Sequence, residues 1–532
     1  MDRKSISVIV LCVVLLAVWN FVVVPKYWPY HPPPPSTNAV TSAESPTATN
    51  VNATSGSNVA SVTANSATSA PPMQMEVNTN ISEQLLVITN ADARYTFSSY
   101  GGGLKLIELP GYPETIPSWR NKKAQAAGVA SLNSYTPSPT LAVLGGSNVQ
   151  GDGIFTLTRT ATGVRAEKTL TNGLTIVKDF SPTTNFLVNA TVSLENRSAQ
   201  PLALPEQEWV VGTSTPMNAD DRGIFDGLMW SDGGKPQDIL GAREFSSRKM
   251  IFMSRIPPTE YRANQTNIVW AAVHNQYFAL AMIASSDAAG VVMRPVILPR
   301  TTTGGELPAY SSNGYTAALI YPQTTLAAHQ DLVRKFILYA GPKKYSLLAK
   351  VAQDLNNNLD ALMNFGMFGI FSKALLLAMN FLHAALDIPY GWIIVLLTVL
   401  LRVIFWPLTA AGTRSMKRMQ ALQPQINALK EKYKDDAVKL QKKQMELWKE
   451  HKVNPMAGCL PSIIQLPVFW GFYRMIYYAI ELRGAHFLWV ADLSKPDTLF
   501  LIPGINFPFN LLPLLMVGVM VWQAHLTPPS PG

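Results

Sequence analysis

The chain has 532 residues, of which 48% are apolar and 14% charged, and its net charge is +9. This length exceeds that of one typical domain, and the low charge content is typical of proteins with membrane segments. Much of the positive charge lies in one loop near the C-terminus, which argues against sequence-specific nucleic-acid binding. The two cysteines, Cys12 and Cys459, lie in apolar segments, so we expect structural thiols and no disulfide framework.

The N-terminal segment combines an apolar run with basic residues in front of it. Residues 6–24 are long enough to cross a membrane, follow Arg3 and Lys4, and lack a small-residue cleavage motif. We therefore predict an uncleaved transmembrane anchor over residues 1–28, with its N-terminus in the cytoplasm. Residues 29–83 consist mostly of Pro, Ser, Thr, Ala and Asn, a composition that predicts a disordered periplasmic linker.

The middle of the chain alternates apolar and polar residues in short runs. Such runs occur, between turns rich in Gly, Asn, Pro and Ser, at residues 84–89, 173–177, 186–192, 268–273 and 334–339. Alternation with a period of two at hairpin spacing predicts a large antiparallel β-sandwich over residues 84–345. Because this region follows an outward-going anchor, we expect it to lie in the periplasm.

Helical, largely apolar segments make up the C-terminal part. A short helix is expected at residues 348–362, and four apolar segments follow at residues 365–386, 390–408, 460–480 and 509–523. In the first of the four, Lys373, Asn380 and Asp387 lie opposite the apolar face. We therefore expect residues 346–388 to form connecting and interfacial amphipathic helices.

The loop at residues 409–458 decides the topology. It carries eleven Lys and Arg residues against five Asp and Glu residues, so the positive-inside rule places it in the cytoplasm. We predict a transmembrane core over residues 389–527 with a cytoplasmic helical hairpin at 411–455, in which Pro424 and the pair Asp435-Asp436 mark helix starts. This basic hairpin is either a dock for the ribosome, targeting factors or anionic lipid headgroups, or a solvated charged face.

Residues for catalysis are not apparent. The sequence contains no Walker A loop, HExxH, CxxC or GxSxG motif in the required surroundings, and His274 and His383 are isolated. We expect no enzyme activity, no cofactor and no metal site. Gly101, Gly102 and Gly103 lie between two strand-like runs, where a turn or a β-bulge is expected.

Arg402 is the charge that the sequence places most clearly inside an apolar segment. A guanidinium at membrane depth costs about 2.5–3.5 kcal/mol on insertion scales, so it normally faces protein or a water-filled cavity. Alternatively, its long side chain reaches the cytoplasmic headgroups. The residues alone leave both interpretations open.

Three motifs resemble those of the YidC-type membrane protein insertases, in the form with a large periplasmic domain. The family's first core helix is similar to Trp392-Ile393-Ile394, Thr398, Arg402 and Trp406-Pro407-Leu408. The approach to its next helix resembles residues 452–461, and the helix itself resembles Ile464-Gln465-Leu466-Pro467-Val468-Phe469.

This resemblance implies a multi-domain inner-membrane protein, with an α-helical insertase core and a periplasmic β-supersandwich. It implies insertion and folding of nascent membrane proteins, alone or with the Sec translocon, and contact with ribosomes, targeting factors and lipids. The residues that it assigns to a hydrophilic substrate groove are Arg402, Thr398, Cys459, Pro461, Leu466, Pro467 and Phe469.

Two further expectations concern the extent of the chain and its competing functions. Family members continue into two more transmembrane helices, so we expect a C-terminally incomplete chain in which residues 528–532 begin a cytoplasmic loop. The alternatives are a transporter or channel, and a membrane-anchored periplasmic carbohydrate-binding module. A transporter would favour paired intramembrane charges or repeated halves, which the sequence does not suggest.

Overall fold

The computed structural model describes residues 75–526, with internal gaps. These gaps are residues 117–127, 137, 218–220, 222, 247, 251–252, 265–266, 286–287, 299–300, 303–304, 307–312, 435, 452, 454–459 and 503–506. The predicted anchor, the linker as far as residue 74, Cys459 and the tail at residues 528–532 therefore lie outside the described residues.

The largest sheet in the described part of the chain has nine antiparallel strands, in the order β13-β12-β17-β18-β24-β9-β8-β7-β6. In that order the strands are Gln237–Leu240, Gly227–Ser231, Trp270–His274, Phe278–Ala284, Asp331–Pro342, Leu187–Asn196, Leu174–Pro182, Val164–Thr169 and Thr156–Arg159. In β9, Val188, Ala190, Val192 and Leu194 are buried, which follows the alternation in the sequence. The strands β17 and β18 are buried almost throughout, so layers cover both faces of the sheet there.

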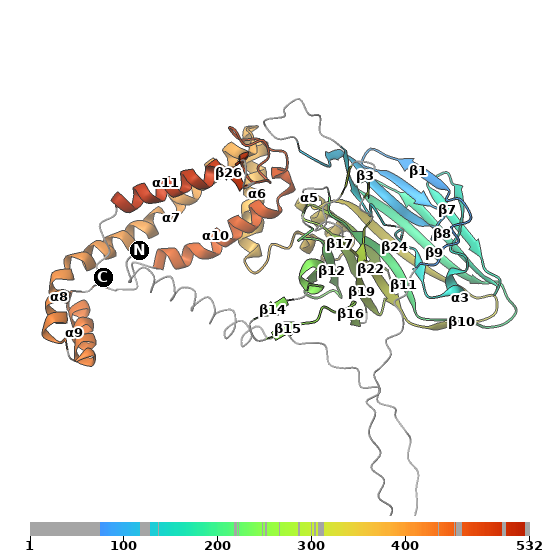
Figure 1. Cartoon of the computed structure of the whole chain (residues 1–532), viewed down its shortest axis with the longest axis horizontal. Helices are drawn as coiled ribbons and strands as arrows, with labels where there is room; N and C mark the ends of the chain where they lie inside the picture. The colour runs from blue at the N-terminus through green and yellow to red at the C-terminus, as the bar shows by residue number, and fades with distance from the viewer. Residues whose placement is uncertain are drawn as a thin grey trace, which may run out of the picture. The chain divides into compact units, whose positions relative to one another are not determined.

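Two smaller sheets supply these layers. One has the order β16-β19-β22-β11-β5, with strands Tyr261–Asn264, Gly290–Ile297, Asn313–Tyr321, Gln207–Ser214 and Val143–Leu144. The other has the order β1-β2-β3-β4, with strands Leu85–Thr89, Arg94–Ser98, Gly103–Pro113 and Val129–Leu132. Trp209 of β11 packs on Phe336 of β24 with ring centroids 6.4 Å apart, and Phe97 of β2 packs on Phe180 of β8 at 5.1 Å. The predicted antiparallel sandwich is confirmed, as the blue to yellow strands of Figure 1 show.

Short elements complete this β-domain. Strands of two or three residues pair as β10 with β23 (Leu202–Leu204, Thr324–Leu326), β14 with β15 (Arg248–Met250, Met253–Arg255), and β20 with β21 (Thr301–Thr302, Gly305–Glu306). The helices are α3 (Ser147–Gln150) and α4 (Gly241–Glu244). Between β2 and β3, Gly101 and Gly102 take φ angles of 71° and 56°, and a Cβ atom on Gly102 would lie 2.4 Å from the Phe155 ring. The glycine run therefore makes the expected turn.

The C-terminal part is helical, apart from the strand pair β25 and β26 (Thr498–Ile502, Phe507–Asn510). Its helices are α5 (Tyr345–Asp354), the 3-10 helix η4 (Leu359–Met363), α6 (Gly369–Leu386), α7 (Tyr390–Ala421), α8 (Gln423–Lys432), α9 (Ala437–Glu450), α10 (Leu460–Tyr478), the 3-10 helix η6 (Ile480–Leu482) and α11 (Leu511–Leu526). A β-domain followed by apolar helices agrees with the predicted fold class.

Two helix boundaries differ from the prediction. The helix expected at residues 348–362 is divided into α5 and η4, because Asn356 takes a left-handed φ of 47° and Asn357 Oδ1 accepts from the backbone N–H of Leu359. The helix expected to end at Leu408 continues to Ala421 as a single 32-residue helix, although Pro407 lies inside it. The apolar run marks only the part of α7 that suits a membrane, and the helix continues into polar sequence.

The helices α6, α7 and α10 pack together through small residues. A Cβ atom on Gly471 of α10 would lie 2.7 Å from the Cβ atom of Phe371 of α6, so only glycine allows this approach. A Cβ atom on Gly391 of α7 would lie 2.4 Å from the ring of Phe487, which stands edge-on to Trp392 at 5.2 Å. These contacts fix the separation of α6 and α10 and the rotation of α7 about its axis.

Of the described helices, α6 and α7 are long and apolar enough to cross a membrane, and α11 is apolar but shorter. Two polar residues of α6 have partners within the protein: Lys373 lies over the Tyr345 ring at 4.8 Å, and Asn380 donates to Glu481 at 3.3 Å. Its surface exposes Ile370 by 84%. Whether α6 spans the membrane or lies in its interface, as the sequence indicated, stays a prediction.

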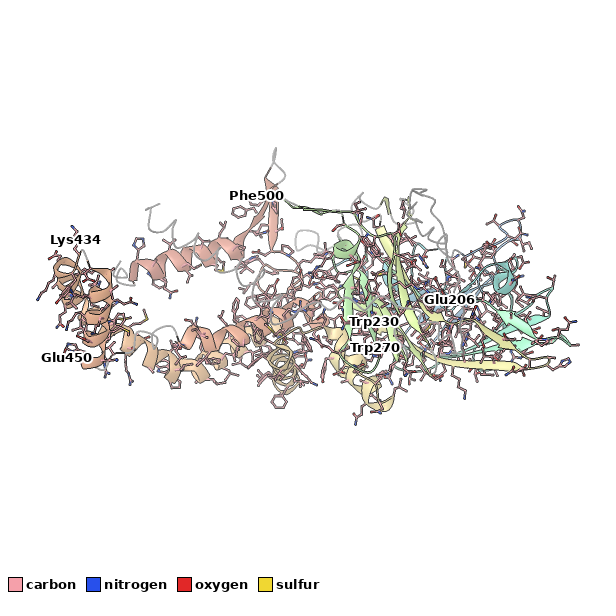
Figure 2. All side chains as sticks on the ribbon, turned by 90° about the horizontal axis from the view of Figure 1, so that it is seen from below. Glu206, Trp230, Trp270, Lys434, Glu450 and Phe500 are labelled. Carbon is pink, nitrogen blue, oxygen red and sulfur yellow. The ribbon has the colours of Figure 1, made fainter. Side chains whose placement is uncertain are left out.

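The helices α8 and α9 form the expected hairpin. Pro424 lies in the first turn of α8, and the side chain of Asp436 accepts from the backbone N–H of Lys439 at 3.0 Å to cap α9. Figure 2 shows Lys434 at the connection between the two helices and Glu450 at the end of α9. The lysines of the hairpin are mostly exposed.

Candidate functional site

The helix α7 presents Thr398 and Arg402 one turn apart on an exposed face. The Thr398 hydroxyl donates to the carbonyl oxygen of Ile394 at 2.7 Å, so the hydroxyl proton has an acceptor within the same helix. Thr398 therefore offers a hydroxyl oxygen, and no free donor, to anything beside the helix.

A cavity of about 470 Å³ surrounds the Arg402 side of α7. Its lining comes entirely from that helix and consists of Arg402, Trp406, Thr409, Ala410, Thr413, Arg414 and Lys417. Of these seven side chains three are cationic and none is acidic, and none of the three cations forms an ion pair within the described residues. The arrangement creates a positive potential that favours an anionic group.

A second cavity, of about 460 Å³, lies on the opposite face of α7. Its lining is apolar and comes from α6, α7 and α10: Phe371, Ala374, Leu375, Ala378, Phe381, Leu382, Leu397, Leu400, Leu401, Ile404, Phe405 and Val468. Sequence analysis did not predict this cavity, because nothing in the apolar runs distinguishes a lipid-facing residue from one that lines a gap between helices. Leu401 and Arg402 are adjacent in sequence yet line different cavities.

Two of the predicted groove residues of α10, Leu466 and Phe469, lie on a face turned away from α6. Leu466 and Phe469 are exposed by 60% and 65%, whereas Gly471 and Met475 are buried. Pro467 lies inside the helix, where its missing N–H leaves the carbonyl group of Ile463 without its usual partner. Pro461 lies in the first turn of α10, and Cys459 lies outside the described residues.

The structure therefore groups the predicted site residues by helix. It brings Thr398 and Arg402 together on α7, and it places Leu466 and Phe469 on one exposed face of α10. The sequence analysis passed over Arg474, a second arginine within the apolar segment at residues 460–480. The signal for it was the same as for Arg402, a guanidinium among apolar residues.

An antiparallel β-domain joined to apolar helices with a cationic cavity defines a membrane protein with a large extramembrane domain. Residues 85–378 match the family described as the YidC periplasmic domain, and residues 381–531 match the family described as the 60Kd inner membrane protein. The chain belongs to the YidC family of membrane protein insertases. This finding confirms the resemblance drawn from the motifs.

Its relatives are named membrane protein insertases. The protein from Citrifermentans bemidjiense is 29% identical over 81% of this chain and 74% of its own length, and that from Neisseria gonorrhoeae is 28% identical over 84% and 79%. The protein from Pelobacter propionicus is 35% identical, but the match spans only 49% of this chain and 45% of the relative. This shorter match covers less than half of the relative's length, whereas the two longer ones cover about three quarters.

Solved structures match the β-domain only loosely. A putative aldose 1-epimerase from Escherichia coli is 12% identical, with a TM-score of 0.31 over 49% of this chain and 99% of its own length. A galactose mutarotase-like protein from Lactobacillus casei is 11% identical, with a TM-score of 0.30 over 48% and 100%. Likeness at this level carries no argument about sugar chemistry.

Proposed function

We propose that this protein inserts inner-membrane proteins and helps them fold, alone or with the Sec translocon, through a hydrophilic groove beside α7. The observation that carries the proposal is the cavity around Arg402, which has three cations and no acid, and which extends from the apolar part of α7 into its polar end. A hydrophilic tail that crosses a membrane must lose its hydration, and a polar cavity shortens the path over which it does so. Arg402 would attract acidic residues of that tail.

The apolar part of a substrate would use α10. Its exposed face offers Leu466 and Phe469, and the dispersion contacts that these side chains make are available to a substrate helix before it moves into lipid. The burial of that helix supplies the free energy, so the proposal requires no nucleotide. Thr398, Cys459, Pro461 and Pro467 would complete the groove.

The arrangement in the membrane is part of the proposal. Residues 1–28 would be the anchor, 29–83 the linker, 84–345 the periplasmic domain, 346–388 the connecting and interfacial helices, and 389–527 the transmembrane core. The helical hairpin α8–α9 would face the cytoplasm, where its exposed lysines favour contact with ribosomes, targeting factors or anionic lipids. The basic charge of the hairpin supports this orientation.

Site-specific photo-crosslinking tests the function. A photo-reactive residue at Leu466 is expected to crosslink to the apolar helix of a ribosome-stalled nascent membrane protein. The control position is Ile370 of α6, which is 84% exposed and lies on the outer face of that helix. Crosslinking at Leu466 and not at Ile370 would support the groove, whereas equal crosslinking at both, or none at Leu466, would contradict it.

A further inference from the structure

Arg474 ties the end of α10 to a loop that follows the β-domain. Its Nη2 donates to the backbone carbonyl of Asn364 and, at 3.1 Å, to the side-chain Oδ1 of the same residue. Its Nη1 donates to the Tyr478 hydroxyl at 3.3 Å, and the guanidinium lies 4.5 Å from the centroid of the Tyr478 ring. No carboxylate pairs with Arg474 within the described residues, so neutral acceptors hold this cation.

Asn364 has a backbone conformation suited to this role. It ends η4 with a left-handed φ of 44°, which asparagine tolerates better than most residues. While its Oδ1 accepts from Arg474, its Nδ2 donates to the carboxylate of Asp238. One side-chain amide thus connects a cation on α10 with an anion on another element.

Asp238 lies on β13, the strand at one edge of the nine-stranded sheet. Its carboxylate also contacts His274 Nε2 of β17 at 3.0 Å. Burial raises the pKa of Asp238, but its hydrogen bonds to His274 and Asn364 and the charges of His274 and Lys343 outweigh burial and leave the pKa below its usual value. The carboxylate is therefore ionised at neutral pH and keeps its bond to Asn364.

Other contacts hold the same end of α10. Gln276 Nε2 donates at 2.9 Å to the carbonyl oxygen of Tyr477, one of the last carbonyl groups of the helix, which have no partner within it. The Phe225 ring stands edge-on to the rings of Tyr477 and Tyr478, at 5.3 and 6.1 Å. Residues of the β-domain therefore surround the final turn of α10.

The connecting loop is fixed at its other end as well. Trp270 Nε1 donates to Asn358 Oδ1 at 2.8 Å, and Asn358 Nδ2 donates to the carbonyl oxygen of Gly234 at 2.7 Å. Figure 2 places Trp270 near Trp230, on the paired strands β17 and β12. The segment from Asn358 to Asn364 thus runs along the edge of the sheet before α6 begins.

We propose that Asn364 is a positioning residue that joins Asp238 of the sheet to Arg474, so that the β-domain sets the position of α10. The helix is continuous from Leu460 to Tyr478, and the hydrogen bonds that fix Arg474 therefore determine where Leu466 and Phe469 lie. In this role the β-domain is a fixed support of the membrane core and does not act as a freely tethered module. The inference concerns the geometry of α10 and holds whether or not the chain inserts proteins.

A distance measurement on the whole protein in lipid nanodiscs tests this role. Spin labels are placed at Asn189, an exposed residue of β9, and at Ile463, an exposed residue near the start of α10, after Cys12 and Cys459 have been replaced by serine. Pulsed electron resonance then gives the distribution of label distances. Because no substrate is needed, the result is independent of the proposed insertion activity.

The informative variant is Asn364→Gly, because glycine keeps the left-handed backbone and removes both side-chain bonds. Its matched control is Asn356→Gly, since Asn356 is also left-handed, with a φ of 47°, but is exposed and lies in the same connection. We expect Asn364→Gly to broaden or shift the distance distribution and the control to leave it unchanged. An Asn364→Gly distribution that superimposes on the unmodified one would overturn the proposal.

A second variant separates positioning from folding. Asp238→Asn removes the anion at the sheet end of the link, and we expect it to broaden the distance distribution in the same way. When Asp238→Asn is combined with Asn364→Gly, we expect no further broadening, because both changes break the same link. Hydrogen exchange of the buried strands β18 and β24 checks that the β-domain remains folded. Additive broadening in the double variant, with these strands protected, would show two separate contacts and contradict a single link through Asn364.

Discussion

The ammonium group of Lys178 donates a hydrogen bond to the carbonyl oxygen of Gly101 at 2.7 Å. Lys178 lies on β8 and is fully buried, and Gly101 lies in the turn before β3. The same Nζ donates to Leu141 O at 2.8 Å and lies 4.4 Å from the centroid of the Phe155 ring. A cation thus holds together two sheets of the sandwich at a position without an acidic partner.

Lys178 should make stability depend on pH. Burial, assisted by the charge of Lys168, lowers the pKa of Lys178 to about 7, whereas an unfolded lysine has a pKa of about 10.4. Between these values the unfolded state binds more protons, so the free energy of unfolding rises with pH by up to about 1.4 kcal/mol per pH unit. Below about pH 7 the cost of burying the charge is fully present.

The test is Lys178→Met, compared with Lys235→Met at an exposed lysine. We expect the stability of the first variant to rise less steeply between pH 7 and 10, because Lys168 and Lys343, whose pKa values burial lowers to about 8, still contribute. The second variant should keep the full rise. The measurement is chemical denaturation followed by tryptophan fluorescence, or hydrogen exchange in β8. An unchanged slope in Lys178→Met would show that another group dominates this pH range.

Asp226 should have the opposite pH dependence. Its carboxyl group is fully buried and has no hydrogen-bond partner among the described residues, and the nearby Ser214 hydroxyl donates instead to the carbonyl oxygen of His274 at 2.8 Å. Burial, with a contribution from the charge of Asp221, raises the pKa of Asp226 well above its usual value. As pH rises above about 4 the unfolded state releases its proton first, and stability falls.

The variant Asp226→Asn keeps the shape of the side chain and removes the titration. We expect it to be more stable than the unmodified protein at pH 7, with a difference that shrinks towards pH 4. Thermal unfolding over this pH range measures the effect. A loss of stability at pH 7 would mean that the carboxyl group has a partner in solution.

Gly471 should be intolerant of even a methyl group. A Cβ atom there would lie 2.7 Å from the Cβ atom of Phe371 and 3.1 Å from the backbone nitrogen of Ser372, so Gly471→Ala must push α6 and α10 apart. We expect a loss of about 1–3 kcal/mol, the usual cost of overpacking. Gly518→Ala in α11 is the control, since a Cβ atom there meets nothing within 4 Å and alanine favours a helix. Thermal unfolding in detergent micelles compares the two, and equal melting temperatures would contradict the close packing.

Arg402→Ala should impair the proposed insertion in a manner that depends on the substrate. We expect a roughly tenfold loss for substrates whose translocated tail is acidic, equivalent to about 1.4 kcal/mol of lost attraction, and a much smaller loss for neutral tails. Lys442→Ala in α9 is the control, because it removes an exposed cation outside the cavity. Insertion into vesicles, scored by protection of the tail from protease, gives the measurement. Equal losses for both tails would argue against an electrostatic role for Arg402.

The sequence predicted local structure well wherever the signal was itself local. The alternation in residues 186–192 predicted β9, and Pro424 and Asp436 predicted the starts of α8 and α9, because period and capping depend on near neighbours. The motif around Arg402 also led to the family that the comparisons show. The position of Arg402 in a groove stays a prediction.

Contacts between distant residues were beyond the sequence. Asn364 and Asp238 are 126 positions apart, and nothing in either neighbourhood indicates that they share a hydrogen bond. The sequence contains a signal that divides the helix expected at residues 348–362, because Asn356, Asn357 and Asn358 favour a turn. The helical spacing of the apolar residues on both sides of these asparagines nevertheless favoured a single helix. The cavity between α6, α7 and α10 depends on which apolar faces meet, and composition does not determine that.

Because two cavities of different polarity lie beside α7, the rotation of this helix about its own axis determines which of them Arg402 lines. Successive residues of a helix point about 100° apart, so deleting one residue ahead of Gly391 would move Arg402 from its cationic cavity to the position of Leu401, which lines the apolar one. The contacts of Gly391 and Trp392 with Phe487 oppose such a turn. A one-residue deletion in the connection between α6 and α7 would therefore place a cation in the apolar cavity, without altering a single side chain of the helix.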